Sequence, residues 1–169
     1  NYDLNYYAVK LTSFTGTLSL YADNTLTGGT SGLVADVIAV VATDGTDPDT
    51  LFVKYRNSGT DNVTIKFTDG ETVTSGQTAA STAVVSTCAT GSRATIDAGT
   101  YYINGFFVNV DTQSLTLDKY TNTPNYRVGL TIVENFVTST DDTTLLDNAQ
   151  GSSNANATGA HRFKIDLTL

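Results

Sequence analysis

Arg162-Phe-Lys-Ile-Asp-Leu-Thr-Leu169 alternates polar and apolar residues without interruption. Successive side chains of an extended strand point to opposite faces, so Phe163, Ile165 and Leu167 would share one face. The stretch therefore predicts a strand, at 162–169, with one buried side. Because an ordered strand at the end of a domain usually pairs inside a sheet, we expect its deletion to unfold the domain.

Alternation continues upstream of this strand. It predicts a strand that starts half exposed at Tyr126 and ends buried near Val137. Residues 106–110 and 115–119 flank the polar break 111–114, which predicts a hairpin between them. Asn104-Gly105 suits either a type I′ turn or a bulge, and the bulge is favoured because 106–110 already has this expected partner.

The first half of the chain carries shorter patterns of the same kind. Strands are expected at 5–11, 18–22, 51–55, 63–67 and 71–74, the last two joined by a tight turn at Asp69-Gly70. The apolar run 33–42 fits a strand better than a short helix, because it is rich in valine and follows glycines. Residues 76–91 are mostly small and polar and predict a loop or weak strand.

The composition agrees with β structure, since Thr, Val and Tyr are abundant and there are 14 Gly and only 2 Pro. We predict an all-β fold, an antiparallel β-sandwich or jelly-roll-like domain, for the 169 residues as one domain, 1–169. The sequence has no Met, so Asn1 is not expected to be the translation start. The chain is expected to be a fragment of a longer polypeptide.

The net charge of -8 argues against nucleic acid as a partner, because phosphate binding needs clustered Lys and Arg. It also disfavours an anionic membrane surface, and no apolar stretch approaches the length of a membrane span. The single cysteine, Cys88, excludes an internal disulfide.

Signs of catalysis are weak. The only histidine is His161, there is no G-x-S-x-G motif, and Cys88 has no basic neighbour to activate its thiol. Glu71 is expected to be solvated after a turn, whereas Glu134 interrupts an apolar strand face and is expected to have a structural partner. We therefore predict no catalytic residue, no cofactor and no enzymatic activity.

Two groups of aspartates are candidate calcium ligands, because they place hard oxygen ligands in expected loops. Asp44, Asp47 and Asp49 form one group, and Asp141 and Asp142 form the other. Neither has the spacing or the closing Glu of an EF-hand, and Asp is a favoured turn residue in any case. No metal site is predicted.

Residues 147–160 contain no side chain larger than Gln, so they cannot anchor themselves by apolar burial. They form either a flexible surface loop or a segment ordered by another subunit. The second alternative makes this stretch a candidate interface loop, with Asp147, Asn148, Gln150, Gly151, Asn154 and Asn156 as its contact residues.

Four motifs in the last part of the chain resemble a domain family of unassigned function that occurs in large virion structural proteins of contractile-tailed, mainly marine, phages. They are Tyr-Tyr-Ile-Asn-Gly-Phe-Phe-Val (101–108), the run 117–130, Asp-Asn-Ala-Gln-Gly (147–151) and the run 159–169. The resemblance implies a tail, baseplate or fibre-associated module located in the virion, with other virion proteins as partners and no catalytic residues to carry over. By analogy with phage appendages it also implies a homo-oligomer, with a homotrimer expected.

Two functions from different classes remain open. The first is an assembly module that packs against other subunits through sheet faces, sheet edges and the 147–160 loop. The alternative is a carbohydrate-binding domain, for host attachment or in a secreted protein, in which exposed rings stack on sugars. Its candidate rings are Tyr2, Tyr6 and Tyr7, or Tyr101 and Tyr102.

Overall fold

The computed structural model describes residues 1–77 and 79–169, with only the backbone of residues 4 and 5. The secondary structure of this described part is β-strands and two short 3₁₀ helices, so the all-β prediction is confirmed. In chain order the elements are β1 (Tyr2–Phe14), η1 (Leu18–Tyr21), β2 (Thr25–Gly28), β3 (Val34–Val41), β4 (Thr50–Tyr55), β5 (Thr72–Ser75), β6 (Thr82–Ile96), β7 (Gly99–Ile103), β8 (Phe106–Val110), β9 (Gln113–Asp118), β10 (Thr131–Val137), η2 (Thr143–Leu145) and β11 (Arg162–Thr168).

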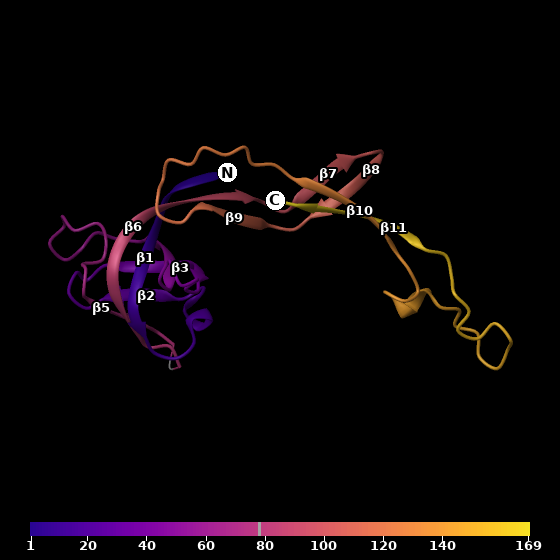
Figure 1. The fold of residues 1–169 in the computed structure, drawn as a ribbon, viewed down its shortest axis with the longest axis horizontal. Helices are drawn as coiled ribbons and strands as arrows, with labels where there is room; N and C mark the ends of the chain where they lie inside the picture. The colour runs from indigo at the N-terminus through magenta and orange to yellow at the C-terminus, as the bar shows by residue number, and fades with distance from the viewer. Residues whose placement is uncertain (78) are drawn as a thin grey trace. The chain divides into compact units, whose positions relative to one another are not determined.

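The chain divides into two compact units (Figure 1). The first, here the barrel unit, comprises residues 1–95 and 115–126. The second, here the ribbon unit, comprises residues 96–114 and 127–169. The expectation of one domain for 1–169 stays a prediction, and each unit is described by itself below.

The barrel unit is a closed antiparallel sheet. Its strands follow the order β1-β4-β3-β2-β5-β6, and β6 pairs again with β1, which completes the ring. β1 and β6 are long strands whose mutual register shifts three times, between Asp3 and Ser13. Such irregularities bend and twist a strand, which closing a barrel requires. The sandwich or jelly-roll arrangement is therefore not confirmed.

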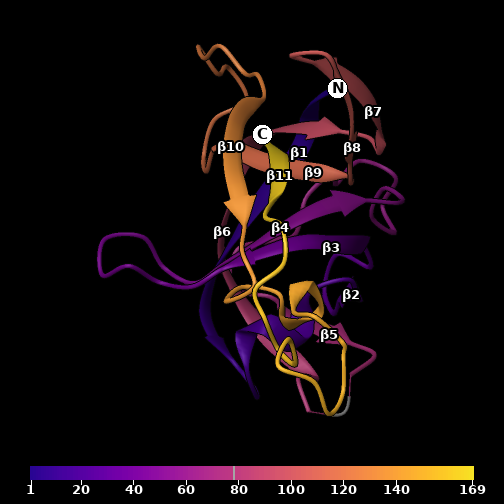
Figure 2. The ribbon, with the colours of Figure 1, turned by 90° about the vertical axis from the view of Figure 1, so that its right-hand side faces the viewer.

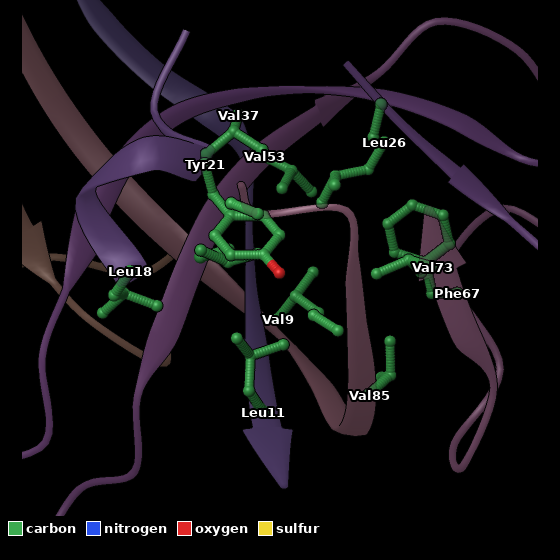
Figure 3. Packing of buried hydrophobic residues seen from close by; sticks show 14 of the residues in the cluster. Val9, Leu11, Leu18, Tyr21, Leu26, Val37, Val53, Phe67, Val73 and Val85 are labelled. Atoms are coloured by element: carbon green, nitrogen blue, oxygen red, sulfur yellow. The ribbon is translucent and has the colours of Figure 1, made fainter. Parts of the chain in front are cut away.

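The barrel interior is filled by inward-pointing apolar side chains from every strand (Figure 3). Those fully buried and largest include Tyr21, Leu26, Phe67, Val9, Val53 and Val73. A second small cluster forms around Tyr6, whose ring stacks on Phe52 with centroids 4.9 Å apart. Gly91 pairs with Tyr6 in the β1–β6 ladder, and a Cβ there would approach the Tyr6 ring to 3.1 Å. This glycine therefore leaves room for the stacked rings.

Most strands predicted in this unit are present, namely 5–11, 33–42, 51–55 and 71–74. The strand predicted at 18–22 is wrong, because these residues form η1. The buried Tyr21 hydroxyl donates to the carbonyl oxygens of Thr15 and Thr82, at 3.0 and 2.5 Å. The short helix thus places an aromatic ring in the barrel interior with its hydroxyl bonded to the rim.

The strand predicted at 63–67 is also wrong, whereas the loop or weak strand predicted at 76–91 is confirmed in part, because a strand begins at Thr82. Residues 63–67 form an irregular loop, in which the Asp61 carboxylate accepts from the amides of Val63 and Thr64. Thr82–Ile96 forms the longest strand, although residue 78 of the expected loop lies outside the described residues. Its Ala, Ser, Thr and Gly residues give little local signal, and its pairing with β1 and β5 supplies the missing stabilisation.

The ribbon unit consists of two antiparallel strand pairs, β7–β8 and β10–β11. Asn104 and Gly105 connect β7 to β8 with φ of 49° and 92°, the left-handed values of a type I′ turn. The preference for a bulge is wrong, and so is the hairpin of 106–110 with 115–119. β8 pairs with β7, whereas β9 joins the sheet of the barrel unit beside β6.

The predicted terminal strand is confirmed as β11, which pairs with β10 over its whole length (Figure 2). The strand predicted from Tyr126 begins only at Thr131, because residues 124–130 have no regular structure. Its expected burial is also wrong, since every β10 residue before Val137 is exposed. Val108, Val110 and Leu167 form the buried hydrophobic cluster of this unit.

Candidate interaction surface

The strand alternation of the ribbon unit separates two faces of the β7–β8 hairpin. Tyr101, Val108 and Val110 point to the inner face, where they pack with Ile165 and Leu167 of β11. Residues one position away point to the outer face and are exposed. A two-stranded sheet can cover only one face of another two-stranded sheet. The other face of each strand pair in this unit therefore remains exposed.

Three phenylalanines, Phe106, Phe163 and Phe136, lie on the same inner face and are here called the aromatic row. They occupy the end of this face that is exposed to solvent. The ring centroids of Phe106 and Phe163 are 5.7 Å apart, and those of Phe163 and Phe136 are 5.6 Å apart. The three side chains are 53%, 44% and 60% exposed. A hollow lined by 106–109 and 163–165 lies beside them. The row is thus an ordered apolar surface in contact with solvent.

Glu134 stands next to this row on β10. The Asn104 amide donates to its Oε1 at 2.6 Å, so the side chain of the β7–β8 turn holds the β10 carboxylate. The expectation that Glu134 has a structural partner is confirmed. The partner is the neutral amide of Asn104, and both side chains are exposed, so Glu134 is not a buried carboxylate paired with a basic residue.

A second aromatic surface lies on the outer face of β7–β8. Tyr102 and Phe107 are directly paired across the two strands, with centroids 5.2 Å apart and rings tilted by 57°. They are 66% and 79% exposed. The neighbouring pair is Thr100 and Asn109, and the Thr100 hydroxyl donates to Asn109 Oδ1 at 2.7 Å. These four residues, here the outer platform, combine two rings with two polar groups.

The predicted sugar-stacking tyrosines lie in different environments. Tyr6 is wholly buried against Phe52, so its ring cannot meet a ligand. Tyr7 is half-buried with its ring edge against Tyr55, and Tyr101 is half-buried in the centre of the ribbon unit. Tyr2 is 61% exposed at the start of β1, and Tyr102 is on the outer platform. Phe107 was not predicted as a site residue, because the sequence analysis paired 106–110 with 115–119 and not with β7. The Asn104-Gly105 dipeptide, which is typical of a type I′ hairpin turn, could have indicated the correct pairing.

The loop 147–160 contains every candidate interface residue, and all of them are exposed. The loop is closed by its own backbone, because Asp147 N donates to Ala157 O at 2.8 Å and Asn156 N donates to Asp147 O at 3.2 Å. A bridge between Leu146 and Thr158 stands at its base. Its fold is thus defined by backbone hydrogen bonds, and its candidate contact residues are left exposed.

Cys88 has the properties of an unreactive thiol. Burial raises its pKa to about 11, although the Tyr55 hydroxyl donates to Sγ at 3.8 Å, which opposes this rise. The thiol is therefore protonated at neutral pH. His161 is exposed just before β11.

Glu71 is buried, so the expectation that its side chain is solvated is wrong. It is 4% exposed and lies in the barrel unit. Its carboxylate accepts from the amides of Thr30, Ser31 and Thr68 at 2.7–3.0 Å and from the Ser31 hydroxyl at 2.9 Å. These four donors belong to two loops, so the carboxylate joins them and has a structural role.

The candidate calcium-binding aspartates form ion pairs and hydrogen bonds within the protein. Lys119 Nζ lies 3.2 Å from Asp44 and 2.9 Å from Asp47, and Asp49 accepts from the Thr43 amide. Asp141 accepts from Thr138, and the Asp142 carboxylate caps η2. Among the described residues there is no group of three or more His, Cys, Asp or Glu side chains arranged to hold a metal ion.

The fold and the surface together define an all-β module with an exposed aromatic surface. Residues 49–169 match the family described as Domain of unknown function (DUF4815), and the chain belongs to this family. No curated protein and no solved structure matches the chain. None of the helices in the described residues is long and apolar enough to cross a membrane.

Proposed function

We propose that this domain is a non-enzymatic structural module of a phage virion, associated with the tail, baseplate or fibre. It assembles by packing the aromatic row of the ribbon unit against other subunits. The single observation that carries the proposal is the exposure of Phe106, Phe136 and Phe163 in one continuous row. The resemblance of the motifs at 101–108, 117–130, 147–151 and 159–169 to virion proteins supports the virion as its location.

The energetics favour a covered row. Fully burying a phenylalanine side chain is worth roughly 1.5–3 kcal/mol, and contiguous exposed apolar residues mark interaction sites more often than apolar residues scattered singly over a surface. The row is supported by only two strand pairs, and a two-stranded pair alone is marginally stable. A partner that covers the row therefore stabilises both the contact and the unit that presents it.

The partner that fits best is another copy of the same chain. Both strand pairs of the ribbon unit leave sheet edges on which a further strand can pair. Identical subunits around an axis bring identical rows together, and a homotrimer is the arrangement implied by analogy with phage appendages. The outward side chains of the loop 147–160 supply polar contacts at the rim of such an interface.

The experiment measures molar mass by light scattering for the wild-type chain from nanomolar to high micromolar concentration. We expect a trimer that dissociates on dilution. Phe136→Asp places a charge in the row and should give a monomer. Val63→Asp is the matched control, because Val63 is 77% exposed in the barrel unit and outside the row. A wild-type chain that stays monomeric throughout, or a Phe136→Asp variant that assembles normally, would overturn the proposal.

A further inference from the structure

The outer platform differs from the aromatic row in composition. β7 and β8 contain no charged residue in a chain of net charge -8. On their outer face Tyr102 and Phe107 form one cross-strand pair, and Thr100 and Asn109 form the next. Two exposed rings therefore stand beside an exposed hydroxyl and amide, without a charge on either strand.

This combination matches the chemistry of a sugar. A pyranose presents C–H groups on its face, which stack on aromatic rings, and hydroxyl groups around its edge, which pair with amides and hydroxyls. Thr100 donates to Asn109 Oδ1, so the Asn109 Nδ2 group is turned away from Thr100 and can donate to a ligand hydroxyl. We propose that the outer platform of the β7–β8 hairpin binds a neutral carbohydrate, with Tyr102 and Phe107 as stacking residues and Asn109 as a hydrogen-bonding residue.

The size of the platform favours this occupant over a protein. A five-residue strand extends roughly 17 Å and neighbouring strands are about 5 Å apart, so the platform accommodates a few sugar rings in a line. A stable protein interface covers about 800 Å² on each partner, which is several times this area. The absence of charge on both strands favours a neutral glycan over a sialylated or sulfated one.

The inference goes beyond the proposed assembly, because it uses the opposite face of the hairpin. Phe107 and Tyr102 point outward, whereas Val108 and Tyr101 point to the centre of the ribbon unit. Replacing the outer rings therefore removes no buried contact. Sugar binding and assembly can be tested by separate substitutions.

The test begins with the wild-type chain on a printed array of neutral, sialylated and sulfated glycans. The strongest neutral glycan is then titrated by calorimetry against the variants. We expect Tyr102→Ala and Phe107→Ala each to weaken binding at least tenfold, and Asn109→Ala to weaken it several-fold. Tyr102→Trp keeps an aromatic face and should retain binding. Phe136→Ala is the matched control, because it removes an exposed ring from the aromatic row and should leave sugar affinity unchanged.

Amide hydrogen exchange of Val108 in each variant establishes that the hairpin remains folded. If no neutral glycan binds the wild-type chain, or if only anionic glycans bind, the proposal is wrong. Binding that survives both alanine substitutions would place the site elsewhere and equally refute it. The Phe136→Asp variant separates the two proposals, since it should lose assembly in light scattering and still bind the glycan.

Discussion

The barrel unit buries its large aromatic side chains, whereas the ribbon unit leaves most of its phenylalanines exposed. In the barrel unit Tyr6, Tyr21, Phe52 and Phe67 are at most 1% exposed. In the ribbon unit Phe106, Phe107, Phe136 and Phe163 are 44–79% exposed. A closed sheet surrounds its inward side chains on all sides, whereas two strand pairs enclose only the few residues between them. The barrel is stabilised by its own interior, whereas the ribbon unit leaves most of its phenylalanine rings in contact with solvent.

The largest expected effect separates a buried ring from an exposed one. Phe52→Ala removes a ring stacked on Tyr6 and should lower the free energy of unfolding by about 3–5 kcal/mol. Phe136→Ala, at 60% exposure, should lower it by about 1 kcal/mol or less in the monomer. Urea unfolding of the two variants at a concentration that keeps the chain monomeric measures both values. Equal losses would mean that the two units do not differ in this way.

The two glutamates also differ in burial between the units, since Glu71 is buried in the barrel unit and Glu134 is exposed in the ribbon unit. Glu71→Ala leaves three loop amides and the Ser31 hydroxyl without their acceptor, and should cost about 3 kcal/mol. Glu134→Ala removes one exposed acceptor from Asn104 and should cost about 0.5 kcal/mol. Thermal unfolding of both variants at neutral pH checks the difference. A Glu71→Ala protein as stable as the wild type would show that the loops find other acceptors.

The turn of the β7–β8 hairpin tests whether the ribbon unit opens independently. Gly105 has φ of 92°, where an alanine is strained, so Gly105→Ala should destabilise the hairpin by about 1 kcal/mol. Gly129→Ala is the control, because no atom lies within 4 Å of its added Cβ. Hydrogen exchange should become faster in β7 and β8 and stay unchanged in β3 and β4. Faster exchange across both units would indicate a single cooperative structure.

The smallest effect concerns acid stability of the barrel unit. The amides of Asp47 and Thr46, followed by the Lys119 ammonium, lower the pKa of Asp44 to about 2. A carboxylate whose pKa is lower in the folded than in the unfolded state stabilises the fold above the unfolded pKa, near 4, and loses this contribution as the pH falls to about 2. Lys119→Met should raise the Asp44 pKa only partly, because the backbone amides remain. Carbon NMR titration of the carboxyl group measures both pKa values, and a wild-type pKa near 4 would contradict this assignment.

The all-β class and most strands could be predicted from local patterns. Alternation is a property of neighbouring residues, so it located β11 without knowledge of its partner, and the valine content of 33–42 and the glycines before it located β3 in the same local way. The same reasoning left 76–91 open between a loop and a weak strand, because the small polar residues of β6 carry no alternating apolar signal. That strand exists because β1 and β5 pair with it on both sides.

The residues of the candidate surfaces are brought together by strand pairing, and the partner of a strand cannot be read from its own local sequence. The sequence alone determined an acidic all-β chain, with one loop of small residues and aromatic strands near Tyr101 and Phe106. Tertiary structure decided that Tyr6 is buried beside Phe52 and that Tyr102 and Phe107 share an exposed face. The physical reason is that alternation specifies two faces for each strand, whereas long-range contacts select the face that is covered. Closure of β6 on β1 enclosed the aromatic rings of one unit, and the absence of such closure between the ribbons leaves those of the other in solvent.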